Sequence, residues 1–321
     1  MTAANSPPAT PAQTAIVMHP TGKTRAILLL TASLVASLVF LLYRFLQPPT
    51  PAPLPVPNGY DKFVAAGQMI SRDVPDWKTA STTELRQFVS SNQSALDLGR
   101  SGLTNQCRVP VQYTTTWIND TASQLPTIKR LAQGYLVEGK LAELEKRPTA
   151  AAASYLSAIT LGIKAAHGGV MINALVATAC EGVGVSGLAQ EVESLDAATS
   201  RSVMNALEKL KTQREPSARI LEEESKWAGA QRRSFQGIAI FLREMVANLS
   251  DRTTETMERL FLDKYESGLQ WELQLQAKLA AHAFTLEKGR PPTNWNEVVP
   301  AYLPAIPSAP FRPDDTNRLT L

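Results

Sequence analysis

Carboxylates are the side chains of this sequence whose types and spacing come closest to chemistry. Three consecutive glutamates, Glu222 to Glu224, lie shortly after Glu215, and paired carboxylates can carry acid–base or metal chemistry. Consecutive residues of a helix point in different directions, however, so the three do not face one ligand. Basic residues nearby can pair with them, namely Arg219, Lys226, Arg232 and Arg233. The pattern therefore favours solvated ion pairs.

Glu181 is a more informative carboxylate because the residues around it are almost all apolar. A buried carboxylate must either be paired or keep its proton through a raised pKa, and such groups gather at functional sites. We expect a structural ion pair at Glu181. A membrane-bound enzyme that uses Glu181 together with Glu222 to Glu224 is the alternative.

Histidines and serines lack the partners that catalysis requires. The three histidines, His19, His167 and His282, are far apart, so no two have metal-ligand spacing. We expect His282 to pack on the apolar face of a helix, and His167 to lie at a helix end, where its charge suits the dipole. The glycines around Ser186 fail the Gly-x-Ser-x-Gly spacing of hydrolases. We therefore predict no catalytic, cofactor-binding or metal-ligating residue.

Two cysteines, Cys107 and Cys180, are too few for a disulfide-dense scaffold or a cysteine-rich zinc module. If the domain lies outside the cytoplasm, the two can form a disulfide. Two buried thiols are the alternative, and the sequence leaves both open.

Composition sets broad limits on the class of protein. Hydrophobic residues make up 44% of the 321 residues, which is enough to bury a core. The formal net charge is only +3 and no long Lys/Arg run is present, so we expect no nucleic-acid partner.

Ala26 to Tyr43 is an uncharged, strongly apolar run near the start of the chain. As a helix rising about 1.5 Å per residue it spans roughly 27 Å, close to the hydrocarbon thickness of a bilayer. We predict a transmembrane anchor at 25–46, which makes this a single-pass protein of the cell membrane. Residues 1–24 are rich in Ala, Pro and Thr without any acidic residue, and we expect a disordered tail there.

A cleaved signal peptide is the alternative for this run, but no small-x-small cleavage site follows it. Lys23 and Arg25 before the run slightly outweigh Arg44 after it. Positive residues favour the cytoplasmic side, so we expect the tail inside and the soluble domain outside the cytoplasm.

A proline-rich stalk is expected at 47–57, directly after the anchor. The run Pro48 to Pro57 favours polyproline II. At about 3.1 Å per residue, this run would hold the following domain roughly 30 Å from the membrane.

From 58 to 288 the apolar residues recur at helical spacing, which predicts a mainly α-helical domain. Its short connections indicate an α-helical bundle or a helical-hairpin array. An irregular segment at 289–321 is expected to pack on the last helix. The expected helices are about 81–98, 126–147, 149–167, 170–190, 196–214, 216–249 and 254–288.

Local signals mark several helix ends. Ser81 and Glu84 form a capping box. Pro148 breaks one helix, and Pro216 suits the first turn of another. Only Val109 to Trp117 hints at a strand.

One helical hairpin, 126–147 with 149–167, resembles the tetratricopeptide repeat. Its small and aromatic residues sit roughly where that family places them: Gly134, Tyr135, Leu141, Ala142, Ala151, Tyr155 and Ala158. Only one such unit is evident, whereas an array would need three or more.

The segment Leu279 to Phe311 resembles the bodies of type II secretion pseudopilins just after their long helix. The matching residues are Gly289, Arg290, Pro292, Val299, Pro300, Tyr302, Leu303, Pro304, Pro307, Pro310 and Phe311. Pseudopilins carry a prepilin-peptidase site directly before their membrane helix, and none precedes Ala26. The resemblance therefore does not carry pilus assembly over to this chain.

The whole layout is also similar to a group of uncharacterised bacterial envelope proteins with a membrane anchor. The shared features are an Asn-Gly-Tyr-Asp start at Asn58 to Asp61 and a Cys-x-x-Pro segment at Cys107 to Pro110. This resemblance implies bacterial origin and membrane attachment, without an activity.

These observations favour a non-catalytic, membrane-anchored helical protein that binds a protein partner at the cell envelope. Two alternatives remain. One is an accessory component of a secretion or pilus-like machine, and the other is the membrane-bound enzyme based on Glu181.

Overall fold

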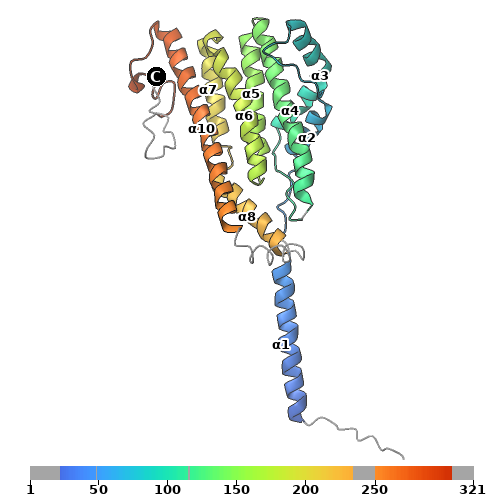
Figure 1. Cartoon of the computed structure of the whole chain (residues 1–321). Helices are drawn as coiled ribbons and strands as arrows, with labels where there is room; N and C mark the ends of the chain where they lie inside the picture. The colour runs from blue at the N-terminus through green and yellow to red at the C-terminus, as the bar shows by residue number, and fades with distance from the viewer. Residues whose placement is uncertain (1–21, 48, 115, 234–249, 306–321) are drawn as a thin grey trace, which may run out of the picture. The chain divides into compact units, whose positions relative to one another are not determined.

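The computed structural model describes residues 22–47, 49–114, 116–233 and 250–305. These residues are mainly α-helical and contain no strand, which confirms the predicted fold class at that level (Figure 1). The chain divides into two units, residues 1–47 and 48–321.

The first unit is one helix, α1 (Gly22–Leu46), which contains the predicted anchor at 25–46. Its described apolar side chains are open to the surroundings, from 58% exposed at Leu38 to 72% at Leu34. The helix therefore has no core of its own within this unit. Residues 1–21 of the predicted tail lie outside the described residues.

The second unit begins with α2 (Gly59–Met69) and α3 (Thr82–Leu103). The predicted capping box is present, with the Ser81 amide donating to Glu84 Oε2 at 2.7 Å and Ser81 Oγ accepting from the Glu84 amide. α3 extends beyond its predicted end near Leu98, because Gly99 and Gly102 lie on its buried face against Tyr135 and Phe63.

The segments Asn58 to Asp61 and Cys107 to Pro110 meet in this unit. The side chain of Asn58 accepts from the Arg108 amide at 3.0 Å and donates to the Arg108 carbonyl at 2.9 Å, in the manner of a backbone pair. The Gly59 amide donates to the Gln106 carbonyl at 2.8 Å. A Cβ on Gly59 would lie 2.3 Å from Cys107 Sγ, so only glycine fits this junction.

α4 (Trp117–Leu144) begins well before its predicted start at Pro126. Trp117 is buried and its indole donates to the Pro110 carbonyl at 2.9 Å, so tertiary packing stabilises the turns before the proline. The alternation at Val109 to Trp117, which hinted at a strand, does not form one in its described residues. Its alternating Val109, Val111 and Tyr113 are buried, but in irregular backbone with no neighbouring strand to pair with among the described residues.

Five further α-helices of the unit lie in the described part of the chain, and Pro148, which was predicted to break the preceding helix, stands at the first position of the next one. They are α5 (Pro148–Ala165), α6 (Met171–Glu191), α7 (Ala197–Lys211), α8 (Ser217–Arg233) and α10 (Ser250–Lys288). Pro216 directly precedes α8, and the predicted continuation to 249 lies outside the described residues after Arg233. Figure 1 shows α4, α5, α6, α7 and α10 side by side with their axes roughly aligned.

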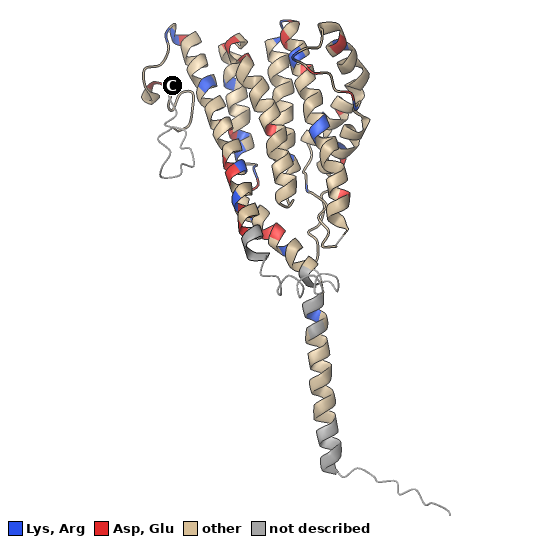
Figure 2. Cartoon of the chain, in the orientation of Figure 1, with Lys and Arg blue, Asp and Glu red and all other residues tan. Residues whose placement is uncertain are grey.

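α6 packs against α5, α4 and α10, as its apolar sequence predicted for a central helix. Its contact with α5 is close because both helices carry glycines there. A Cβ on Gly162 would lie 2.6 Å from the Ala177 carbonyl oxygen, and one on Gly184 would lie 2.5 Å from that of Tyr155. Lys, Arg, Asp and Glu are interspersed along the helices of this unit (Figure 2).

The segment after α10 turns at Gly289, whose φ of 70° favours glycine, and folds back. Its Tyr302 ring lies 5.5 Å from the Phe284 ring of α10. Glu287 joins this contact by accepting from Tyr302 at 2.8 Å and pairing with Arg201 of α7 at 2.7 Å. Residues 306–321, including Pro307, Pro310 and Phe311 of the pseudopilin resemblance, lie outside the described residues.

Candidate functional site

Glu181 lies on α6 in a buried ion triad. Its Oε2 is 2.6 Å from Nη2 of Arg214, and the same guanidinium nitrogen is 2.6 Å from Oε2 of Glu272 on α10. The Glu181 and Glu272 side chains are each 5% exposed and that of Arg214 is 8% exposed. The predicted ion pair is therefore confirmed, with a second carboxylate that the sequence did not indicate.

Two carboxylates around one guanidinium leave an excess negative charge in the core. Burial raises the pKa of Glu181 to about 7, with Arg214 opposing the rise, and burial likewise raises the pKa of Glu272. Glu272 Oε1 and Gln276 Nε2 are buried without a hydrogen-bond partner among the described residues. The raised pKa values favour the protonated form of these carboxyl groups, and a proton on either one would relieve the excess charge.

The glutamates of α8 have three different environments. Glu222 is exposed and pairs with Lys226 at 2.7 Å, as the prediction of solvated pairs stated. Glu223 instead accepts from the hydroxyl of Tyr113. Glu224 accepts from the Met171 amide at 2.9 Å, so it caps the N-terminus of α6. Glu223 also lies 3.6 Å from Nζ of Lys226, so it keeps a predicted ion pair but is largely buried rather than solvated. For Glu224 the prediction was wrong, because packing of α8 turned it inward.

His282, His167 and the cysteines take structural positions. His282 Nε2 lies 2.9 Å from the Leu195 carbonyl oxygen, and Nε2 of His167 contacts the Gln213 carbonyl just beyond the end of α5. Cys107 and Cys180 are both free and buried. The structure therefore does not bring Glu181, Glu222, Glu223 and His282 together around a ligand, since each has a separate set of partners. Among the described residues, no group of three or more His, Cys, Asp or Glu could hold a metal ion.

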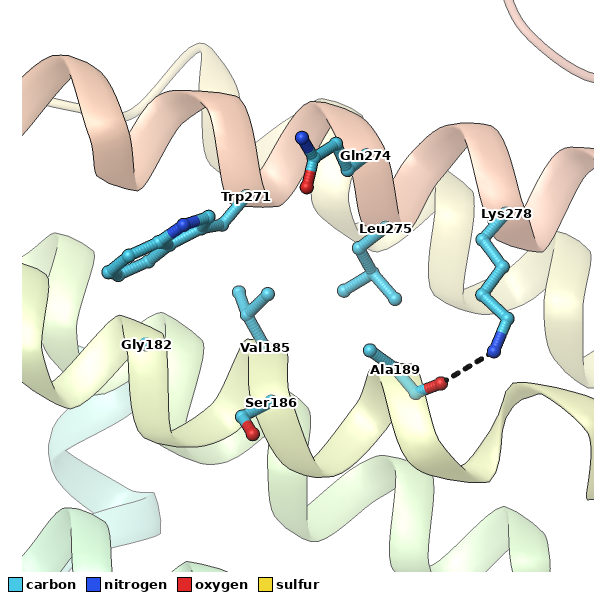
Figure 3. A pocket seen from close by; sticks show the side chains of 8 residues that line it. All are labelled: Gly182, Val185, Ser186, Ala189, Trp271, Gln274, Leu275 and Lys278. Carbon is cyan, nitrogen blue, oxygen red and sulfur yellow. Dashed lines mark hydrogen bonds between the residues drawn. The ribbon is translucent and has the colours of Figure 1, made fainter. Parts of the chain in front are cut away.

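A groove with a largely apolar lining runs over a face of α6 (Figure 3). We call it the tryptophan groove. One half, of about 490 Å³, lies toward α10, and the other, of about 390 Å³, lies toward α4. The halves share Gly182, Ser186 and Trp271, so they are continuous. The remaining lining residues are Trp77, Leu136, Lys140, Ala179, Val183, Val185, Gly187, Ala189, Gln190, Gln274, Leu275 and Lys278.

The floor and walls of the tryptophan groove differ in size. Small residues of α6, such as Gly182 and Ser186, form the floor. Trp271 of α10 is 47% exposed, and its ring lies over Gly182. Trp77, from the loop before α3, forms the opposite wall with its ring 4.8 Å from Nζ of Lys140.

Lysines at the two walls of the groove are held by groups of the chain itself. Lys140 pairs with Glu143 at 2.7 Å. Lys278 donates to the Ala189 carbonyl at 2.9 Å, a bond drawn in Figure 3. These bonds fix the walls and leave an apolar strip between them.

Sequence reasoning missed this groove. Ser186 was considered only for the Gly-x-Ser-x-Gly spacing, and its exposed position on α6 did not follow from that. Trp77 and Trp271 gave a usable signal, because a large aromatic residue outside the core often marks a binding surface.

The fold and groove together define a helical unit with a buried ion triad and an open apolar groove over its central helix. No protein-family model, curated protein or solved structure matches the chain.

Proposed function

We propose that this chain is a single-pass membrane protein whose helical unit binds the apolar face of a partner helix in the tryptophan groove. The observation that carries the proposal is the uncovered strip of α6, bounded by Trp77 and Trp271.

Membrane attachment is assigned to α1. Its described apolar side chains have no partners in their unit, and a bilayer would cover them. Among the described residues, Met171–Ser194 is the stretch long and apolar enough to cross a membrane, and Leu29–Leu41 is a shorter apolar one. The former is 56% buried inside the helical unit, which suits a core helix.

Orientation follows from the charges next to α1. Lys23 and Arg25 precede the apolar run and Arg44 follows it, which favours the helical unit outside the cytoplasm, at the cell envelope. An extracytoplasmic reporter enzyme fused after Pro57 should be active, and a cytoplasmic one should not. The opposite pattern would reverse the orientation, and release of the chain by mild salt would refute the anchor.

A helix is the partner that best fits the groove. The groove follows the axis of α6, and its floor of small side chains allows a second backbone to approach closely. Two tryptophan walls supply large apolar contact area, which is typical of binding hot spots. The apolar strip predicts a partner helix with one apolar face.

Site-specific photo-crosslinking tests this function in the full-length chain. A photoreactive residue at Ser186 should give a defined adduct with the partner, whereas the same residue at the exposed Ser90 of α3 should not. Ser186→Trp fills the groove from a solvent-facing position, so it should abolish the interaction while leaving the thermal midpoint unchanged. Equal adducts from both positions would refute the groove as the binding site.

An accessory role in a secretion or pilus-like machine is a second candidate. It is supported by the packing of Tyr302 against Phe284 at the end of α10, since the resembling pseudopilin segment also follows a long helix. Copurification of the full chain with components of such a machine, lost on Tyr302→Ala, would favour it.

A further inference from the structure

A second cavity of the helical unit is polar and basic, unlike the tryptophan groove. It measures about 680 Å³. Three of its lining side chains, Arg108, Lys164 and His167, are basic, and none of the lining residues is acidic. The other lining residues are Pro53, Leu54, Pro55, Thr104, Asn105, Gln106, Cys107 and Gln213.

The guanidinium of Arg108 is available to a ligand. No described residue forms a hydrogen bond or ion pair with it. Its Nε and Cζ lie 3.0 and 3.1 Å from the point where a Cβ on Gly168 would be. Gly168, with a φ of 65°, therefore leaves the space in which the Arg108 side chain lies flat against the backbone. The backbone of Arg108 is fixed as well, by the two hydrogen bonds with Asn58.

Lys164 adds a positioned donor group. Nζ of Lys164 donates to the carbonyls of Leu103 and Asn105, at 2.5 and 3.1 Å, and no carboxylate of the described residues pairs with it. Those bonds hold the ammonium in place and leave its third N–H unused.

The remaining groups near the cavity supply no activated nucleophile, so they favour a binding site over a catalytic one. Burial raises the pKa of the Cys107 thiol to about 11, with Lys164 opposing and Asp61 adding to the rise. Cys107 is therefore a neutral thiol at neutral pH. Asp61, the carboxylate that reaches this region, is exposed and lies 3.4 Å from the amide of Asn58 rather than on the cavity wall.

We propose that this cavity binds a phosphate group. A guanidinium fork and an ammonium, with no carboxylate among the lining residues, form a donor set that recognises phosphate oxygens. The cavity is larger than one phosphate ion, and its volume is typical of small-ligand sites. Pro53, Leu54 and Pro55 give it an apolar wall beside the donors. Two sources share this chemistry: a soluble phosphate ester and the headgroup of an anionic phospholipid.

The soluble source is tested on the full chain in micelles of an uncharged detergent. Inorganic phosphate and glycerol 3-phosphate are titrated by calorimetry at constant ionic strength. Arg108→Gln should weaken binding by about tenfold, as expected for the loss of a charge-assisted hydrogen bond. Arg108→Lys keeps the charge without the fork and should bind with intermediate strength. Arg72→Gln, at an exposed arginine outside the cavity, is the matched control and should bind like the parent chain.

The lipid source is tested in nanodiscs of phosphatidylcholine with and without phosphatidylglycerol. Native mass spectrometry of the released full chain should show retained phosphatidylglycerol, reduced by Arg108→Gln but not by Arg72→Gln. Binding in the micelle arm alone assigns a soluble ligand, and binding in the nanodisc arm alone assigns a lipid headgroup. Absence of binding in both arms, or equal loss with both variants, overturns the proposal. Neither result bears on the tryptophan groove, which this proposal does not use.

Discussion

α1 and α6 are both long and apolar, but their apolar side chains are covered to different extents within their own units. α1 carries large aliphatic side chains that stay exposed within its own unit, such as Leu34 at 72%. α6 carries glycines and alanines, which let α5 approach closely, together with one carboxylate, Glu181. The difference shows that hydropathy alone does not separate an anchor from a core helix. Small residues and a charge with a distant partner mark the core helix.

The largest effect is expected from breaking the ion triad that ties α6 to α10. Arg214→Met removes the only cation of the triad and leaves two carboxylates in the core. We expect a loss of about 3–5 kcal/mol in the free energy of unfolding, as for other buried pairs that lose one partner. Urea unfolding of the full chain in detergent measures it.

The matched control for this prediction is Arg86→Met. Arg86 pairs with Glu145 at 2.8 Å, but its side chain is 56% exposed. Loss of an exposed pair should cost less than about 1 kcal/mol. Similar losses in the two variants would contradict the assignment of the triad as a buried charge centre.

Much of the fold could be predicted because its signals are local. The capping box at Ser81 and the helix-starting prolines Pro148 and Pro216 act within one helical turn. The predicted start of α4 at Pro126 was wrong for the same reason. It was placed from the local sequence, whereas the distant packing of Trp117 extends the helix toward its N-terminus.

The site was harder to predict because its parts come from distant segments. The need for a partner to Glu181 followed from its apolar neighbours, but the identity of that partner did not. Arg214 lies beyond the end of α7 and Glu272 lies on α10, so only tertiary packing joins them. The tryptophan groove depends in turn on which face of α6 its neighbours leave uncovered.

A smaller effect on the free energy of unfolding is expected from the protonation of Glu181 on α6. The pKa of Glu181 is raised by burial from its ordinary value of 4.5 to about 7. Between these pH values the folded chain keeps a proton that the unfolded chain has lost. The free energy of unfolding should therefore fall as the pH rises from about 4.5 to 7, by up to about 3 kcal/mol, and level off above that.

Glu181→Gln should reduce the dependence of the free energy of unfolding on pH. The difference between the variant and the parent chain then separates the contribution of Glu181 from that of other titrating groups. Glu287, whose pKa is lowered to about 2 by hydrogen bonds from Arg201 and Tyr302, contributes only below about pH 4.5. Unfolding midpoints in urea across the pH range provide the measurement. An unchanged slope in the variant would show that Glu181 stays ionised in the core.

The packing of the two faces of α6 can be compared by replacing one glycine with alanine on each face. A Cβ on Gly184 would lie 2.5 Å from the Tyr155 carbonyl oxygen and 2.9 Å from the Ile159 amide, and backbone atoms cannot move aside alone. Gly184→Ala should therefore destabilise the chain by about 1–3 kcal/mol through overpacking.

On the groove face, a Cβ on Gly182 would meet only the edge of the Trp271 ring, at 3.2 Å. That side chain is half exposed and can shift. Since alanine also favours the helix over glycine by up to about 1 kcal/mol, Gly182→Ala should be neutral or stabilising. Thermal unfolding of both variants decides the matter, because equal losses would mean that the groove face of α6 is packed as tightly as its core face.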